Sequence, residues 1–312
     1  MRALVTGGAG FIGSNLVDAL LARGDEVTVV DDLSTGRREN LSGALAGGAE
    51  LVELDIREGR GLGGVASRTR PEVVFHLGAQ IDVRRSIADP AFDASINVGG
   101  TANVLEAARD AGARRVVFTS TGGAIYGEGE GQSLPLDEDA PIAPLAPYGQ
   151  SKFAGEGYLA LYQRLHGLSG VSLRLGNVYG PRQDPLGEAG VVAIFCGRLK
   201  AGERPTIFGD GRQTRDYIYV GDVVAAQLAA ADSGVGGAFN VGTGVETDVL
   251  ALVERLTALG GAEGFEPEFA PPREGEVRRI AIDPTRAERE LGWRAETGLE
   301  EGLRITLESL SG

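Results

Sequence analysis

A glycine-rich turn between the first strand and the first helix of the sequence constrains this chain more than any other feature. The apolar stretch 3–6 is followed by Gly7, Gly10 and Gly13, and a helical pattern with one apolar side runs over 12–23. In such a turn the first glycine allows the bend, the second lets the backbone approach a pyrophosphate, and the third lets the helix pack closely on the strand. The N-terminus of the helix then meets the phosphate charge. The spacing, G-x-x-G-x-x-G, predicts a unit that binds a dinucleotide, and it differs from the G-x-G-x-x-G of ordinary dehydrogenases.

The first half of the chain alternates short apolar strands with longer helical segments. We expect helices at 12–23, 94–110 and 149–167, lying between strands at 3–6, 27–31, 51–54, 73–77, 116–120 and 171–175. Strands rich in valine and leucine that are joined by helices indicate a parallel sheet covered on both faces. Because crossovers in such sheets are right-handed, the expected fold class is α/β, a doubly wound parallel sheet of the Rossmann type.

The pattern changes after about residue 176. Loops rich in proline and glycine appear, with a late strand at 238–241, helices at 246–259 and 300–310, and an extended stretch at 265–272. No repeat or low-complexity linker separates the two halves. We therefore expect residues 1–175, joined by roughly 212–245, to form a dinucleotide-binding Rossmann domain. Residues 176–211 and 246–312 are expected to form a smaller α/β substrate lobe that interleaves with it.

Charge and composition exclude several classes of function. Lys and Arg total 30 while Asp and Glu total 44, so the net charge is −14 and the sequence pI is near 4.7. A surface this acidic repels nucleic-acid phosphates and anionic lipid, so we expect neither as a partner. The single cysteine, Cys196, and the two histidines, His76 and His166, provide neither a disulfide framework nor a metal site. With no signal peptide and no apolar run of membrane length, the chain is expected to be a soluble cytoplasmic protein.

Several conspicuous residues are predicted to be structural. His76 lies at the end of a buried strand and His166 near a helix end, and Cys196 has the surroundings of a small packed residue. The acidic run 137–139 is expected to be a solvated loop. Glycine is abundant, 49 of 312 residues against a usual share of roughly 7%, and the run at 59–64 is interpreted as a composition bias.

The end of the second strand predicts which dinucleotide is bound. Asp31 and Asp32 stand there, and Asp31 is eighteen residues beyond Gly13. A carboxylate at this place can accept both hydroxyls of the adenosine ribose and repels a 2′-phosphate, which favours NAD over NADP. Arg37 and Arg38 oppose this reading, because an arginine accommodates that phosphate.

A tyrosine and a lysine are the candidate acid–base groups of the site. Tyr148 and Lys152 are four residues apart on a helix that begins just after Pro147, so both project from one face. A tyrosine with a pKa near 10 is a weak base at neutral pH, but an adjacent ammonium and a positive nicotinamide favour its phenolate. Thr121 ends a strand and supplies a hydroxyl at the carboxyl edge of the sheet, where such folds bind their ligands.

Together these motifs resemble the extended short-chain dehydrogenase/reductase family, and within it the NAD-dependent UDP-glucose (UDP-galactose) 4-epimerases of the bacterial and archaeal type. The resemblance covers residues 1 to about 302. It is carried by Asp31, Y-x-x-x-K and the phrases T-G-G-A-G-F-I-G-S (6–14), S-T-G-G-A-I-Y-G-E (120–128), G-N-V-Y-G-P-R-Q-D-P (176–185), G-E-A-G-V-V-A-I-F (187–195) and R-D-Y-I-Y-V-G-D (215–222).

The resemblance implies roles for particular residues. Tyr148 would be the general base, Lys152 would lower its pKa and hold the nicotinamide ribose, and Thr121 would hydrogen-bond the 4-oxygen of the sugar. Tyr148 and Thr121 would thus also contact the substrate, with arginines on its diphosphate, Phe208 near the uracil and Glu276 on the uridine ribose. The other substrate contacts are Asn177, Arg215 and Arg273. The cofactor contacts are Gly7, Gly10, Phe11, Ile12, Gly13, Asp31, Asp32, Ser34, Thr35, Gly36, Asp55, Ile56, Leu77, Ala79, Gln80, Asn97, Tyr148 and Lys152.

The implied reaction is the interconversion of UDP-glucose and UDP-galactose through a transient 4-keto sugar, by an NAD-dependent isomerase that forms a homodimer. UDP-glucuronate and UDP-N-acetylglucosamine are alternative substrates, since Gly176 replaces a residue that is often aromatic and leaves room near the sugar. A nucleotide-sugar 4,6-dehydratase is a rival reading, but those enzymes carry an Asp-Glu pair after the threonine, where this chain has Gly122 and Gly123. A non-catalytic NAD-binding scaffold is a rival of another class, and the presence of both Tyr148 and Lys152 argues against it.

Overall fold

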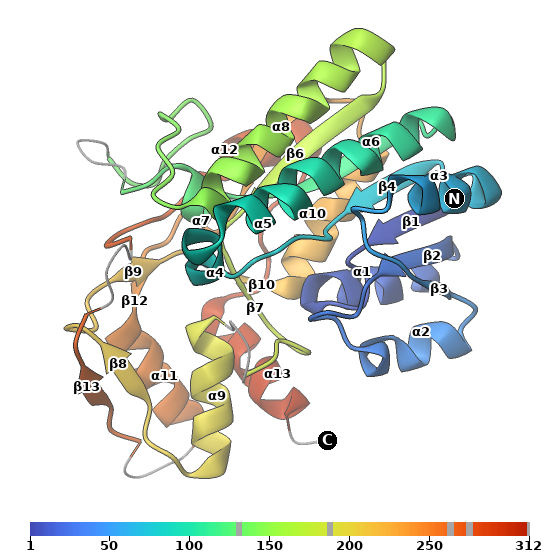
Figure 1. Cartoon of the computed structure of the whole chain (residues 1–312). Helices are drawn as coiled ribbons and strands as arrows, with labels where there is room; N and C mark the ends of the chain where they lie inside the picture. The colour runs from blue at the N-terminus through green and yellow to red at the C-terminus, as the bar shows by residue number, and fades with distance from the viewer. Residues whose placement is uncertain (129–132, 186–189, 261–264, 273–276, 311–312) are drawn as a thin grey trace.

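The computed structural model describes residues 1–128, 133–185, 190–260, 265–272 and 277–310 (Figure 1). Its centre is a seven-stranded sheet in the order β11-β6-β5-β4-β1-β2-β3, in which every neighbouring pair is parallel. The strands are β1 (Arg2–Thr6), β2 (Glu26–Asp31), β3 (Glu50–Glu53), β4 (Val73–His76), β5 (Arg115–Thr121), β6 (Ser169–Leu175) and β11 (Gly237–Val241). The strand order reverses between β1 and β4, which opens a crevice at the carboxyl ends of these two strands.

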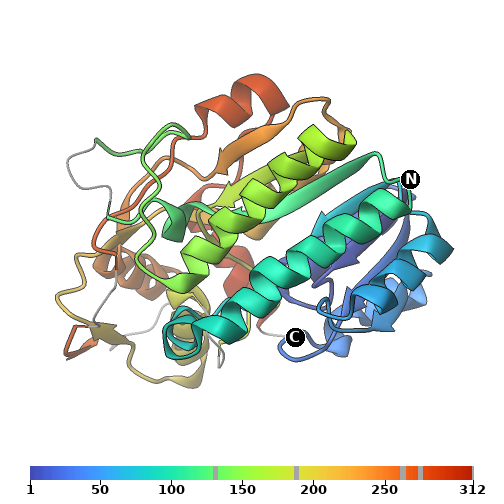
Figure 2. The same cartoon turned by 45° about the horizontal axis from the view of Figure 1, so that its top comes forward.

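Helices cover both faces of this sheet (Figures 1 and 2). One face packs against α3 (Gly59–Thr69), α6 (Thr101–Asp110) and α8 (Pro147–His166), and the other against α1 (Phe11–Ala22) and α10 (Val220–Asp232). The pleat divides β5 between the two cores, because Val116 and Phe118 pack with α6 and α8 while Val117 packs with α1 and α10. The strands are therefore buried on both sides, and this explains why valine and leucine follow one another in them without alternating polar residues.

A second group of elements lies beyond the carboxyl edge of the sheet, at the lower left of Figure 1. Three helices there, α9 (Val191–Ala201), α11 (Val249–Gly260) and α13 (Leu299–Ser309), share one hydrophobic core. Three short strand pairs accompany them: β7 (Asn177–Tyr179) with β10 (Tyr217–Tyr219), β8 (Thr206–Phe208) with β13 (Glu268–Ala270), and β9 (Thr214–Arg215) with β12 (Thr247–Asp248). The remaining elements are η1 (Arg38–Leu41), α2 (Ser42–Ala46), α4 (Val83–Ala88), α5 (Pro90–Ala94), η2 (Ser95–Gly100), α7 (Gly122–Ile125) and α12 (Thr285–Leu291).

The predicted fold class is confirmed, and β11 returns to the main sheet beside β6 as the interleaved arrangement requires. The helix expected at 94–110 is a π-helical η2 followed by α6. Several helices on the main sheet were not predicted, and the two longest of these are α3 and α10. The glycine-rich run at 59–64, interpreted as a composition bias, is the first half of α3, and α10 is so uniformly apolar that it has no amphipathic pattern. The division at residues 175, 212 and 245 remains a prediction.

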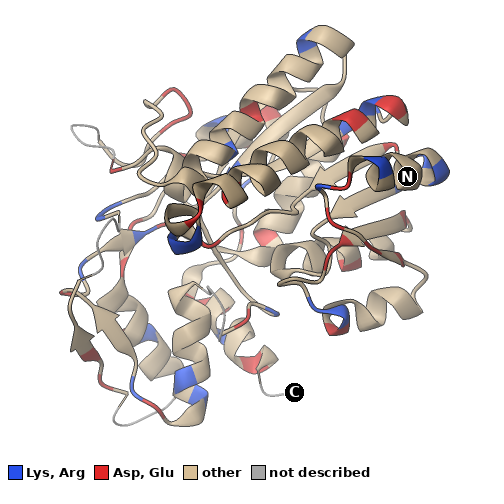
Figure 3. Cartoon of the chain, viewed as in Figure 1, with Lys and Arg blue, Asp and Glu red and all other residues tan. Residues whose placement is uncertain are grey.

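Basic and acidic residues are distributed along the chain in both groups of elements (Figure 3). Within the described ranges, none of the helices combines the length and the apolar character needed to cross a membrane.

Candidate active site

The turn between β1 and α1 is closed by contacts between backbones. Gly7 has φ +70°, and a Cβ atom there would lie 2.6 Å from the Gly78 nitrogen, at the end of β4. A Cβ at Gly13 would lie 2.2 Å from the Gly7 carbonyl oxygen. Helix α1 begins at Phe11, and its N-cap, Gly10, has no side chain to cover the first peptide N–H groups. These donors are left for an anion, so the residues present fit the pyrophosphate of a dinucleotide.

Asp31 is buried at the end of β2 and held by the backbone. Its Oδ2 accepts a hydrogen bond from the Ala9 nitrogen at 2.9 Å, and its Oδ1 accepts one from the Leu33 nitrogen at 2.9 Å. Burial raises the pKa of this carboxyl, and the two backbone donors oppose the rise. A Cβ at Gly36 would lie 2.7 Å from Asp31 Oδ1, so the segment 34–36 folds closely around the carboxylate. Asp32 differs, because its exposed Oδ1 accepts from the Ser34 nitrogen and hydroxyl.

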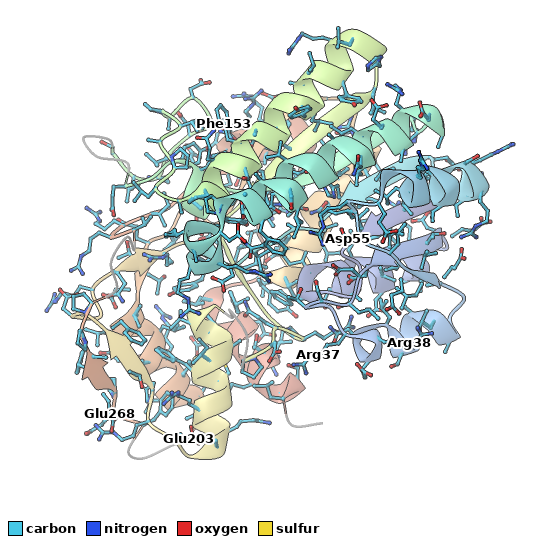
Figure 4. The ribbon with its side chains drawn as sticks, in the orientation of Figure 1. Arg37, Arg38, Asp55, Phe153, Glu203 and Glu268 are labelled. Carbon is cyan, nitrogen blue, oxygen red and sulfur yellow. The ribbon has the colours of Figure 1, made fainter. Side chains whose placement is uncertain are left out.

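Arg37 is already engaged by a carboxylate. Its guanidinium forms an ion pair with Asp184, which follows the Pro-Arg-Gln sequence of the second half of the chain. Figure 4 shows Arg37 and Arg38 on the segment after β2. The positive charge of Arg37 is therefore partly neutralised. This weakens the argument that Arg37 and Arg38 would attract the 2′-phosphate of NADP.

Asp55 also has an unforeseen partner. Both of its carboxylate oxygens accept from the Arg57 guanidinium, which lowers the Asp55 pKa. Ile56 is buried and packs against Gly100, where a Cβ would lie 2.6 Å from its Cδ1. The expected contact of Asp55 and Ile56 with the cofactor remains a prediction.

The segment after β4 is fixed by a buried amide. Asn97 accepts from the Gln80 nitrogen at 2.9 Å and donates to the Gln80 carbonyl oxygen at 2.8 Å, so it lies behind the predicted cofactor contacts Leu77, Ala79 and Gln80. The Asn97 and Gln80 side chains both donate to Asp93 Oδ1, each at 2.9 Å. Asp93 was missed by sequence reasoning, because no motif marks a carboxylate whose partners lie up to 58 residues away.

Thr121, Tyr148 and Lys152 meet at the carboxyl end of β5. Glycines allow this approach: a Cβ at Gly149 would lie 2.4 Å from the Ala124 carbonyl oxygen of α7, and one at Gly155 would lie 2.6 Å from the Phe118 ring. The start of α8 therefore lies directly over β5 and α7. Tyr148 hydrogen-bonds to Thr121, and Lys152 Nζ donates to the Thr119 carbonyl oxygen at 2.9 Å.

The electrostatics of this group differ from the expectation. Burial and the nearby charge of Asp93 raise the pKa of Tyr148 to about 12, and only the hydrogen bond with Thr121 opposes the rise. Burial lowers the pKa of Lys152 to about 8, against the charges of Asp93 and Glu156. The shift of the Tyr148 pKa is thus opposite in direction to the expectation, and its causes are burial and the charge of Asp93.

Buried polar residues beneath the site are structural. His76 joins Thr6 of β1 (2.7 Å) to Thr101 of α6 (3.0 Å), and burial lowers its pKa to about 3, so it stays neutral. Glu156 pairs with Arg174 at 2.8 Å. The solvated loop expected at 137–139 is wrong in one respect: Glu138 is half-buried, accepts from the Asn240 nitrogen at 2.7 Å, and has its pKa raised by burial.

One of the predicted substrate contacts, Asn177, lies near this group. Asn177 Oδ1 would be 3.3 Å from a Cβ at Gly123, which places the amide beside the start of α7. Phe208 and Arg215 are half-buried at the ends of β8 and β9, and Arg215 Nη1 donates to the Thr214 carbonyl oxygen. Arg273 and Glu276 lie outside the described residues, as do 187–189 of the phrase G-E-A-G-V-V-A-I-F.

We expected Gly176 to leave room near the sugar, and the structure contradicts this. A Cβ at this position would lie 2.9 Å from the Asp216 carbonyl oxygen. The glycine is required by this close packing between β6 and β10, so it says nothing about the size of the substrate.

The doubly wound sheet, the glycine turn and the Tyr148–Lys152 pair define an NAD-dependent enzyme of the short-chain dehydrogenase/reductase class. A family model described as "NAD dependent epimerase/dehydratase family" matches residues 3–242. The chain belongs to this family.

Relatives of known structure and function agree over almost the full length. A UDP-glucose 4-epimerase of Mycolicibacterium smegmatis is 52% identical over 99% of this chain and 98% of the relative. The crystal structure of a Thermotoga maritima UDP-glucose 4-epimerase with UDP-glucose superposes with a TM-score of 0.95 at 46% identity, covering 100% of this chain and 99% of that one. A Thermus thermophilus UDP-glucose 4-epimerase in complex with NAD gives a TM-score of 0.92 at 44% identity, with the same coverage.

Proposed function

We propose that this protein is an NAD-dependent UDP-glucose 4-epimerase that interconverts UDP-glucose and UDP-galactose through a 4-keto sugar. The observation that carries the proposal is the meeting of Tyr148, Thr121 and Lys152 at the carboxyl end of β5, the strand next to the crevice between β1 and β4. The similarity to UDP-glucose 4-epimerases over the whole chain supports the choice of reaction and of nucleotide sugar.

The residues would divide the work as follows. The Tyr148 phenolate takes the proton of the sugar 4-hydroxyl and returns it after the sugar has turned in the site. Thr121 hydrogen-bonds to the 4-oxygen, and Lys152 holds the ribose next to Tyr148 and contributes its positive charge. When bound at this site, NAD would supply the redox chemistry, as acceptor of the C4 hydride and then as its donor to the opposite face of the ring. Because the hydride returns in every cycle, no external oxidant is consumed.

The same residues would hold the two ligands. The N-terminus of α1 and the Gly7–Gly13 turn would receive the dinucleotide phosphates, Asp31 the adenosine ribose, and the segment 77–80 the cofactor beyond it. Asn177, Phe208 and Arg215 would contact the UDP-sugar, together with Arg273 and Glu276. A guanidinium suits a diphosphate because it pairs with phosphate oxygens in a bidentate manner.

A 4,6-dehydratase needs an extra acid directly after Thr121, and this chain has Gly122 and Gly123 there. A Cβ at Gly122 would lie 2.6 Å from the Ile282 side chain, so the site next to Thr121 is filled. Loss of the 6-hydroxyl needs an acid and a base there that this chain does not carry.

The test is a substrate panel without added cofactor. Purified protein is incubated separately with UDP-glucose, UDP-galactose, UDP-glucuronate and UDP-N-acetylglucosamine, and the sugars are followed by NMR. We expect the first two to interconvert with the highest kcat/KM. Loss of water, a higher value for the glucuronate or the N-acetyl sugar, or no reaction with any of the four would each contradict the proposal.

A further inference from the structure

Asp93 is a buried charge that the reaction outlined above does not use. Its side chain belongs to α5, has no exposed surface, and accepts three hydrogen bonds. The donors are Gln80 Nε2 and Asn97 Nδ2 at 2.9 Å on Oδ1, and the Ser151 hydroxyl at 2.6 Å on Oδ2. All three donors are neutral, and among the described residues no lysine or arginine forms an ion pair with Asp93. A buried carboxylate with neutral partners alone is costly unless a cation lies near it.

Lys152 is in the complementary situation. Its side chain is 3% exposed, and its ammonium donates to a neutral acceptor, the Thr119 carbonyl oxygen. Ser151, which donates to Asp93, directly precedes Lys152 on α8, and α5 packs against this part of α8. The two buried charges of opposite sign are therefore neighbours that do not touch.

The other charged groups around Lys152 are accounted for. Glu156, one turn further along α8, is neutralised by Arg174 of β6 at 2.8 Å, and His76 of β4 is neutral. Tyr148 lies one turn earlier on α8. On α4, which packs against α5, both arginines are exposed, and Arg85 stacks on the ring of Phe92. Asp93 is thus the carboxylate near Lys152 that has no cation of its own.

We propose that Asp93 is the counter-ion of Lys152: a positioning residue that keeps the Lys152 ammonium charged in its buried site while fixing Gln80 and Asn97 beneath the cofactor. The kinetic part of this inference rests on the proposed epimerase function. The direction of the electrostatic effects agrees with it, since Asp93 raises the pKa of Lys152 and, through the same charge, raises that of Tyr148.

Because Asp93 raises the pKa of both Lys152 and Tyr148, removing its charge should lower both values. A residue that served only as a hydrogen-bond acceptor would not have this effect. In Asp93→Asn the amide keeps the size and an acceptor oxygen but removes the charge. The Lys152 ammonium loses its stabilisation and the Tyr148 phenolate loses a repulsion, so both groups titrate at lower pH. In the NAD-loaded enzyme the rising limb of the kcat–pH profile, set by Tyr148, and the falling limb, set by Lys152, should both move to lower pH.

The experiment compares kcat–pH profiles of the wild type, Asp93→Asn and a matched control, Asp82→Asn. Asp82 caps α4 eleven residues earlier, is partly exposed, and contributes a charge that solvent screens. We expect both limbs of Asp93→Asn to shift by about one pH unit, so that the ratio of the rate at pH 6 to the rate at pH 9 rises at least about tenfold. The control should retain the wild-type profile. Unshifted limbs in Asp93→Asn, with or without a lower rate, would overturn the proposal.

A stability cycle tests the pairing without any assay of epimerisation. Thermal unfolding is measured at saturating NAD for Asp93→Asn, Lys152→Met and the double variant. If the two charges compensate each other, the double variant loses clearly less stability than the sum of the single losses. Additive losses would contradict the pairing, as would a double variant that fails to fold when Lys152→Met folds. If the wild type proves inactive in the substrate panel, the proposed function fails while this cycle still decides the pairing.

Discussion

At the scale of single residues, the assigned base is the least expected feature of the molecule. Burial holds the pKa of Tyr148 at about 12, well above what a base at neutral pH needs. The Thr121 hydroxyl and the positive charges of Lys152 and of a bound nicotinamide act in the opposite direction. The working pKa of Tyr148 is therefore a property of the loaded site, and the protein supplies only part of it.

Tyr148→Phe isolates this role. The ring remains to pack at the start of α8, but the proton acceptor is gone, so we expect kcat to fall by about 10²–10⁴-fold. NAD bound to the purified protein, measured by absorbance after denaturation, should stay at the wild-type level. A variant that turns over as fast as the wild type would remove Tyr148 from the reaction.

Asp31 carries the choice of cofactor. Asp31→Asn keeps the size of the side chain and removes the charge that repels a 2′-phosphate, so NAD should bind about tenfold more weakly or worse, the cost of losing a charged acceptor. NADP should gain relative to NAD. Dissociation constants of both cofactors for the stripped protein measure this, with Glu39→Gln on the exposed η1 as a control for net charge. A wild type that prefers NADP would show that Arg37 and Arg38 dominate despite the pairing of Arg37 with Asp184.

Residues whose position is set by local sequence could be located in advance, and those defined by distant partners could not. Asp31 follows a strand at a fixed distance from Gly13, and Tyr148 and Lys152 share a helix face, so their positions followed from spacing together with the glycine motif, while their roles remain predictions. Asp93 and Glu138 are defined by donors 58 and 102 residues away, which no local pattern contains.

At the scale of elements, some helices could be predicted from the sequence and others could not, because only some of them carry a local pattern. Helix α1 has one apolar side and was predicted from its period. In α10 the exposed side consists mostly of glycine, alanine and leucine, so the sequence shows no contrast between the two sides. Helix α3 was missed because its glycines lower helix propensity, and the packing of Leu62 and Val65 in the core overrides that preference.

The closeness of α8 to β5 can be tested with a glycine pair. In Gly155→Ala the new methyl group would lie 2.6 Å from the buried Phe118 ring, so α8 must shift and the free energy of unfolding should fall by about 1–3 kcal/mol. Because Tyr148 and Lys152 lie on this helix, kcat should fall as well. The control is Gly64→Ala on α3, where a Cβ meets open space and the substitution should stabilise by about 0.5–1 kcal/mol. Chemical denaturation measures both, and equal effects of the two substitutions would contradict the packing account.

At the scale of the whole molecule, buried carboxylates on either side of β10 bind backbone segments between β11 and α13. Asp216, between β9 and β10, accepts from the nitrogens of Thr243, Gly244 and Ile282. Asp222 of α10 accepts from the nitrogens of Glu296 and Thr297. Such contacts explain why the sequence shows no linker: the substrate-side elements are held to the main sheet at several points rather than through one connection.

The last prediction concerns assembly. The resemblance to the epimerase family implies a homodimer. Val104 and Leu105 of α6 are buried within the chain, whereas α8 leaves apolar side chains exposed. Phe153 is 39% exposed on the outer side of α8 (Figure 4), and Tyr158 and Leu165 are 39% and 65% exposed. Tyr158 and Leu165, which are seven residues apart, lie on one side of α8, and an exposed apolar side of a helix is typical of a face that another protein covers.

We infer that a second copy of the chain covers α8, and we expect light scattering at micromolar concentration to give twice the monomer mass of 32.4 kDa. The double variant Tyr158→Glu/Leu165→Glu places two carboxylates where desolvation is costly, so it should give the monomer mass. Phe269→Glu is the matched control, because Phe269 is 60% exposed on β13, in the second group of elements, and should leave the mass unchanged. A wild type of 32.4 kDa would contradict the dimer, and a double variant that keeps the doubled mass would place the interface on another face.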